Sequence, residues 1–232
     1  MRTEADRNPS ILRYVIQICA LVVIFSASLF FSSGTLNWLM GWSYLGLVAA
    51  SQGIMAIVLV KKNPDLASDR TQLQGKRDLD RVLAGVMALY GPICICIISG
   101  LNHRYGWQPY IPLPLQVAAL GVAVTGTLIT MWAMATNKFF YSVMRIEPEK
   151  GHTVCTNGPY KYIRHPGYFG ALLFDVATPW MLGSIWALIP TIVTVCAIVV
   201  RTMLEDRTLQ DELDGYKNYT QQVGERLLPN LW

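Results

Sequence analysis

The apolar residues of the 232-residue chain fall into long runs separated by short polar segments. A helix needs roughly 20 apolar residues to cross a membrane. Four runs meet that length: residues 11–33, 36–60, 79–101 and 115–135. A fifth run, residues 168–200, is too long for one ordinary span and is interrupted at 179–183, so two shorter helices in a hairpin fit it better. The pattern predicts an all-α, polytopic membrane bundle of about six spans, ending in that hairpin.

The connections between these runs predict how the spans are oriented. The loops at 33–36, 102–114 and 179–183 hold one arginine between them, whereas the other connections and both ends hold most of the remaining basic residues. Because positively charged loops stay on the cytosolic side, we expect both termini and the polar segment 137–167 in the cytosol. The chain is thus predicted to be a multi-pass integral membrane protein in contact with membrane lipids.

The composition agrees with this class and excludes several kinds of site. Of the residues, 53% are hydrophobic and only 15% are charged, against roughly 25% charged in a soluble domain. A formal net charge of +4 is too small to indicate a nucleic-acid partner. The three histidines and five cysteines show no metal-ligand or disulfide spacing, so neither a metal site nor a disulfide framework is expected.

One irregular polar segment, residues 158–170, stands between two apolar runs. Its sequence, Gly-Pro-Tyr-Lys-Tyr-Ile-Arg-His-Pro-Gly-Tyr-Phe-Gly, has two X-Pro steps and three glycines, which prevent a continuous helix. Its cations could simply follow the topology rule, and its tyrosines could form an interfacial aromatic belt. Neither explanation accounts for the prolines and glycines. Because glycines let the backbone approach a ligand closely, we interpret the segment as a binding site.

A second candidate lies directly after the last apolar run. Arg201 and Glu205 are four residues apart and therefore share one face of a helix. We expect that helix to begin near Arg201 and to continue to about Tyr219. Taken alone, this pair is better explained as an interfacial salt bridge, because such pairs are common and contribute little.

The two segments form a joint pattern. It reads Gly-Pro-Tyr-x-Tyr-x-Arg-His-Pro-x-Tyr-x-Gly, an apolar hairpin, Arg-x-x-x-Glu-acid-x-x-Leu, and finally Tyr-x-x-Tyr and Arg-x-x-Pro. The matching residues are Gly158 to Gly170, Arg201, Glu205, Asp206, Leu209, Tyr216, Tyr219, Arg226 and Pro229. From about Asn137 to the C-terminus, this pattern resembles the isoprenylcysteine carboxyl methyltransferase family.

The resemblance implies methyl transfer from S-adenosylmethionine at the cytosolic membrane face. It implies catalytic roles for Arg201 and Glu205, and cofactor contacts for Tyr160, Arg164, His165, Pro166, Tyr168, Gly170 and Glu205. Members commonly carry two glutamates in the last helix. Here the second acid is Asp206, which is one methylene shorter, so the role is assigned to Glu205.

The resemblance also implies how the chain is divided. Residues 1–135 are expected to be N-terminal transmembrane helices, and residues 136–232 a catalytic region. The cofactor pocket is expected between the 137–167 loop and the C-terminal helix. Within it, Glu205 would meet the cofactor's ammonium or ribose, while Arg164 and His165 would hold its carboxylate. Arg201 would orient the carboxylate of a lipophilic acceptor, such as a prenylated cysteine or a similar isoprenoid acid.

Several alternatives remain open at this stage. A phospholipid or amine N-methyltransferase would share the cofactor, and a sterol-type reductase would use NADPH with a similar Arg-His-Pro region. A membrane scaffold or small transporter would predict charges inside the spans, where Asp175 is nearly alone. A lipid-tailed acceptor could enter past five residues that serve equally well as packing or interface residues: Phe139, Phe140, Tyr141, Trp180 and Met181.

Overall fold

The computed structural model describes residues 4–62, 78–141, 146, 149 and 151–228, and every regular element among them is a helix. The elements are, in chain order, α1 (Glu4–Ser33), α2 (Leu39–Lys62), α4 (Asp78–Gly85), the π-helical η1 (Val86–Tyr90), α5 (Gly91–Tyr105), α6 (Leu113–Thr136), the 3₁₀ turn η3 (Gly158–Lys161), α7 (Pro166–Met181), the 3₁₀ turn η4 (Ile185–Ala187), α8 (Leu188–Glu212) and α9 (Tyr216–Gln222). The all-α prediction is confirmed.

Five of these helical stretches are long and apolar enough to cross a membrane: Leu12–Ser33, Leu39–Val58, Asp78–Tyr105, Leu113–Thr136 and Ile185–Glu212. Large apolar side chains on them face outward, including Phe31 at 84% exposure and Ile189 at 62%, as expected of surfaces in contact with lipid. The expected sixth span, α7, has 16 residues. Its length of about 24 Å falls short of a hydrocarbon core of about 30 Å. The protein is thus a multi-pass helical bundle with one short arm.

The C-terminal hairpin is confirmed, but its second arm is longer than expected. Helix α7 ends at Met181, and α8 starts at Leu188 and packs against it. Helix α8 then continues without a break past Arg201 to Glu212. The expectation of a separate charged helix beginning near Arg201 is therefore wrong, because no helix-breaking residue occurs before Gly215, whose φ is 83°. The charged residues are the end of the last span, and α9 follows the break.

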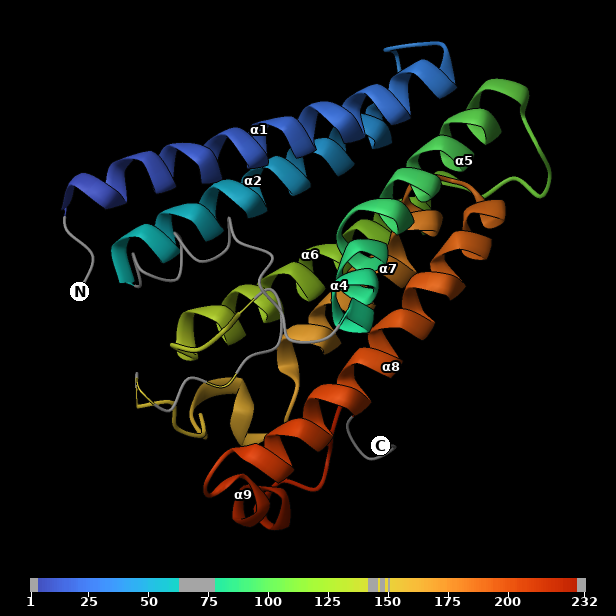
Figure 1. Ribbon diagram of the computed structural model, residues 1–232. Helices are drawn as coiled ribbons and strands as arrows, with labels where there is room; N and C mark the ends of the chain where they lie inside the picture. The colour runs from blue at the N-terminus through green and yellow to red at the C-terminus, as the bar shows by residue number, and fades with distance from the viewer. Residues whose placement is uncertain (1–3, 63–77, 142–145, 147–148, 150, 229–232) are drawn as a thin grey trace.

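The helices pack around one main hydrophobic core. Figure 1 shows α1 and α2 running side by side, with α4, α5 and α8 on the other flank. Helix α1 also packs against α5, α2 against α6, and α6 against α7. Fully buried side chains in this core include Leu29, Tyr44 and Met181. The site described below lies away from this core, at the end of the bundle where α8 leads into α9 (Figure 1).

The third span changes helix type in its middle. In η1 the backbone N–H of Gly91 donates to the carbonyl of Val86, five residues earlier. This π-helical turn ends at Tyr90, two residues before Pro92, whose missing N–H cannot continue the hydrogen-bond ladder. At the same point Gly91 lies against Thr194 of α8, where a side chain at position 91 would collide with the Thr194 hydroxyl. The irregular turn therefore brings α4 and η1 against α8.

Helices α6 and α7 approach closely through two glycines. A Cβ atom placed on Gly126 would lie 2.5 Å from the carbonyl oxygen of Gly170 and 2.9 Å from the backbone nitrogen of Phe174. A Cβ on Gly170 would collide with Thr130 and with the Gly126 carbonyl. Because the obstacles are largely backbone atoms, they cannot move aside as a side chain would. The two glycines thus fix how α7, and with it the polar segment before α7, sits on α6.

We expect Gly126→Ala to destabilise the fold by about 1–3 kcal/mol, because the added methyl group overpacks the α6–α7 contact. Gly121→Ala is the matched control, since a Cβ at this position of the same helix meets nothing within 4 Å. The measurement is the thermal unfolding midpoint of both variants in detergent. Equal midpoints would contradict the role assigned to this contact.

Candidate active site

The segment 158–165 forms a compact turn before α7. Gly158 has a φ of 56°, and a Cβ there would lie 2.8 Å from the hydroxyl of Thr136, so both its conformation and its surroundings require glycine. Pro166 is the first residue of α7, a position where its missing N–H costs nothing. The prolines and glycines of this segment therefore shape the backbone and place Arg164 and His165 at the start of α7.

This turn pairs with the C-terminal segment of the chain. The backbone N–H groups of Arg164 and His165 donate to the carbonyls of Glu225 and Arg226, each at 2.9 Å. The Nη1 of Arg164 also donates to the carbonyls of Val223 at 2.9 Å and Gly224 at 2.7 Å. Residues 223–226 are thereby held across the entrance to α7 by both backbone and side-chain bonds.

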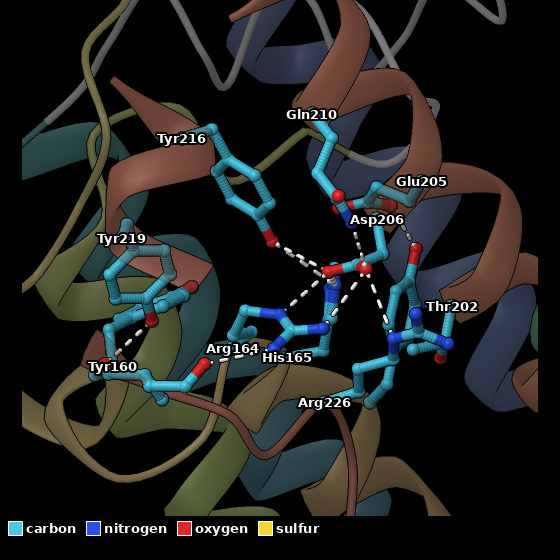
Figure 2. Close-up of polar contacts among 12 residues, drawn as sticks. Tyr160, Arg164, His165, Thr202, Glu205, Asp206, Gln210, Tyr216, Tyr219 and Arg226 are labelled. Atoms are coloured by element: carbon cyan, nitrogen blue, oxygen red, sulfur yellow. Dashed lines mark hydrogen bonds and ion pairs between the residues drawn. The ribbon is translucent and has the colours of Figure 1, made fainter. Parts of the chain in front are cut away.

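The carboxylate of Asp206 is the centre of the cluster that these segments enclose (Figure 2). Asp206 is 1% exposed. Arg164 binds it in a bidentate contact, in which Nε donates to Oδ1 at 2.8 Å and Nη2 donates to Oδ2 at 3.1 Å. Its other partners are His165 Nε2 at 3.2 Å, Tyr216 Oη at 3.0 Å, Gln210 Nε2 at 2.8 Å and Arg226 Nε at 3.2 Å.

Two arginines share the single carboxylate of Asp206. The side chain of Arg164 is 4% exposed, whereas that of Arg226 is 35% exposed. Of the two guanidinium groups, that of Arg226 is therefore the more accessible to an anionic group.

Three buried tyrosines, Tyr160, Tyr216 and Tyr219, lie beside the cluster (Figure 2). The Tyr219 hydroxyl donates to the carbonyl of Tyr160 at 2.6 Å, and the Tyr160 hydroxyl accepts a bond from the amide of Asn137 at 3.3 Å. Burial raises the pKa of the Tyr216 phenol, and the neighbouring charge of Asp206 raises it further. Tyr216 therefore stays protonated and acts as a hydrogen-bond donor to Asp206.

A second set of polar contacts lies along α8 one turn earlier. Arg201 Nε donates to Asp80 Oδ1 of α4 at 2.9 Å. The hydroxyl of Tyr168, on α7, donates to Glu205 at 2.5 Å. The guanidinium of Arg201 lies 5.7 Å from the centre of the Tyr168 ring. Arg201, Tyr168 and Glu205 are therefore neighbours, and the ring of Tyr168 also stacks on His165 with 5.9 Å between the ring centres, which connects the two sets.

The structure thus brings most of the predicted site residues together. Arg164 and His165 meet α8 through Asp206, and Tyr168 meets it through Glu205. Tyr160 joins through Tyr219. Two predicted residues are placed differently, because Pro166 forms the buried start of α7 and Gly170 packs on α6.

The suggested acceptor entry is not supported for Trp180 and Met181. Both residues belong to the main core, and Met181 is fully buried there. They lie at the opposite end of α7 from His165, about 22 Å away along the helix. The other three residues lie before the turn, where Phe139 stacks on His152 with ring centres 4.2 Å apart.

Sequence reasoning missed the residue on which the cluster depends. The resemblance assigns the role to Glu205 because the side chain of Asp206 is shorter than the usual glutamate, yet Asp206 binds more partners than Glu205. The pattern contains Asp206, Tyr216 and Arg226, and an arginine at 164 without a nearby acid is a signal that an acid from elsewhere must meet it. Asp80 had no such signal.

Known proteins match the same part of the chain. The model of the isoprenylcysteine carboxyl methyltransferase (ICMT) family matches residues 119–211. This confirms the family resemblance over α6, α7 and α8. The matched stretch holds Arg164, His165, Glu205 and Asp206, while the remaining partners of the two polar sets, Tyr216, Arg226 and Asp80, lie outside it.

Individual relatives also match, each over less than half of this chain. A probable protein-S-isoprenylcysteine O-methyltransferase from Oryza sativa subsp. indica is 39% identical over 69 residues, which are 29% of this chain and 36% of the relative. The protein-S-isoprenylcysteine O-methyltransferase of Rattus norvegicus is 31% identical over 100 residues, 43% of this chain and 34% of its own. That of Schizosaccharomyces pombe is 31% identical over 70 residues, 30% of each. The matches to these ICMT relatives span about a third of their length.

We expect Asp206→Asn to destabilise the protein by about 3 kcal/mol, because it leaves the guanidinium of Arg164 buried without a counter-charge. Residues 223–226 should also become easier to cleave with protease, since Arg164 holds them. Asp211→Asn is the control, because Asp211 is exposed on the same helix. Thermal unfolding and limited proteolysis check both effects. An Asp206→Asn variant as stable and resistant as the control would show that the cluster does not depend on this charge.

Proposed function

We propose that the protein is a membrane methyltransferase that transfers the methyl group of S-adenosylmethionine to the carboxylate of a lipophilic acceptor. The acceptor we favour is a prenylated cysteine or a similar isoprenoid acid. The observation that carries the proposal is the meeting of the 158–168 segment with Glu205 and Asp206 of α8, within the part of the chain that matches the ICMT family.

The side chains present fit the charges of the cofactor. S-adenosylmethionine supplies an electrophilic methyl group on a sulfonium and carries an ammonium and a carboxylate. Glu205, half-buried and bound by Tyr168, would receive the ammonium or a ribose hydroxyl. The positive side of the Asp206 cluster, where Arg226 is the most exposed cation, would receive the carboxylate.

The remaining residues would act through position. Arg164 and His165 are bound to Asp206, so they would hold the wall of the site in shape as well as supply positive charge to it. Tyr160 and Tyr168 offer aromatic faces suited to the adenine or the sulfonium. Arg201 would orient the acceptor carboxylate for attack on the methyl carbon. Such a displacement depends on alignment and exclusion of water more than on a strong base, which agrees with a site of buried, mutually fixed side chains.

We further propose that this site and both termini face the cytosol, since the connections 33–36, 102–114 and 179–183 hold one arginine between them and positively charged connections stay on the cytosolic side. Tags placed at either end should be accessible to protease in inside-out membrane vesicles and protected in right-side-out ones. The reverse pattern would reject this orientation.

The first test is a titration of the purified protein with S-adenosylmethionine, its demethylated product and NADPH. We expect binding of the first two only, because Glu205 and the positive cluster match their amino-acid moiety. Binding of NADPH alone would instead identify a reductase, and binding of none would favour a scaffold. Methyl transfer to phospholipid amines but not to a prenylated cysteine would identify the alternative acceptor.

The second test uses the variant Glu205→Gln, which removes the negative charge that would pair with the cofactor ammonium and keeps the size of the side chain. We expect an affinity for S-adenosylmethionine at least about tenfold lower, because a charged hydrogen bond contributes roughly 1.5–3 kcal/mol. Glu212→Gln, on the exposed end of the same helix, should bind as the wild type does. Calorimetry of both variants decides the point, and wild-type affinity in Glu205→Gln would remove this residue from the site.

A further inference from the structure

The ion pair between Asp80 and Arg201 joins two segments that are 121 positions apart in the chain. Asp80 lies in the first turn of α4 and Arg201 near the middle of α8. The Nε···Oδ1 distance is 2.9 Å, and each side chain is only 7% exposed. A buried pair of this kind contributes little net stability, because desolvation offsets most of the attraction. Its presence beside Glu205 therefore suggests a role other than stability.

The fold is arranged to deliver Asp80 to this position. The π-helical turn η1 and the close contact of Gly91 with Thr194 set α4 and η1 against α8. Asp80 is the acid of α4 that reaches α8, whereas Asp78 lies 3.6 Å from Arg81 with its own side chain 97% exposed. Two acids two residues apart on one short helix thus have opposite surroundings.

Asp80, rather than Glu205, is the ion-pair partner of Arg201. On α8 alone, Arg201 would pair with Glu205, four residues further along the same face. In the structure each side chain of that pair is bound elsewhere, Arg201 by Asp80 and Glu205 by Tyr168. An arginine that turned toward Glu205 would neutralise the carboxylate proposed for the cofactor and withdraw the guanidinium proposed for the acceptor.

We propose that Asp80 is a positioning residue that holds the Arg201 guanidinium for the acceptor carboxylate and keeps it from Glu205. This inference rests on the proposed function. Asp80 binds the guanidinium at Nε and thereby fixes the direction in which the group points. Asp80 lies outside the stretch that matches the ICMT family, so this chain would set its acceptor site partly with α4.

The test compares Asp80→Asn and Asp80→Glu with the control Asp78→Asn in the full-length protein, reconstituted in lipid nanodiscs. Three quantities are measured: S-adenosylmethionine affinity by calorimetry, kcat and KM for a synthetic S-prenylated N-acetylcysteine with a free carboxylate, and the thermal unfolding midpoint. Wild-type binding and turnover are measured first. Their failure would reject the proposed function, and with it the basis of this inference.

Given an active wild type, we expect Asp80→Asn to raise the acceptor KM about tenfold, while cofactor affinity changes less than about threefold, because the guanidinium is displaced and the cofactor contacts are not. Asp80→Glu keeps the charge but moves it by one methylene, so its KM should rise by a smaller factor, about threefold. Asp78→Asn should match the wild type in all three measurements.

Two results would overturn the inference while leaving the proposed function intact. One is a wild-type acceptor KM in Asp80→Asn. The other is a parallel loss of cofactor affinity, turnover and thermal stability in both Asp80 variants, which would indicate a structural role alone. If Asp80→Asn does not fold, Asp80→Glu decides. A raised acceptor KM with retained cofactor affinity would support positioning, and an unchanged KM would reject it.

Discussion

The constraint on which the site depends is the burial of one carboxylate, that of Asp206. A charge that is 1% exposed requires opposite charge and hydrogen bonds from every available direction. These partners come from the turn before α7, from α8 itself, from α9 and from the C-terminal segment. The hydrogen bonds and ion pairs of this one carboxylate therefore determine how four separate parts of the chain meet at the end of the bundle. Residues 223–226 are in turn fixed through Arg164.

Adjacent positions on a helix point about 100° apart, and α8 uses this to give its two neighbouring acids different partners. Asp206 faces the turn and α9, whereas Glu205 faces α7 and binds Tyr168. Asp206 is saturated by partners of the chain itself, whereas Glu205 is half-buried and is bound by Tyr168. The first is suited to hold structure and the second to meet a ligand. The shorter side chain stands at the more crowded of the two positions.

The lengths of the apolar runs were sufficient to predict the spans and the C-terminal hairpin, because lipid imposes a minimum length and leaves few other folds. The end of α8 was not predictable from hydropathy, since charged residues continue a helix as readily as apolar ones. The specific pairing of Arg164 with Asp206 and of Asp80 with Arg201 was not predictable either. The paired residues lie up to 121 positions apart, and only tertiary packing, here the contacts of Gly126 and Gly91, brings such segments together.

The stretch that matches the ICMT family includes only part of the proposed site. The matched residues 119–211 contain both acids of α8 together with Arg164, His165 and Arg201, and thus most of the proposed site. Tyr216 and Arg226, which complete the Asp206 cluster, come from the segment after it, and Asp80 comes from the segment before it. Because an ion pair fixes the direction of a guanidinium as well as its charge, the orientation of Arg201 depends on α4. The placement of the acceptor would then depend partly on a segment outside the matched stretch, and a change in the π-helical turn before Gly91 would alter acceptor selection without changing a residue proposed to contact the cofactor.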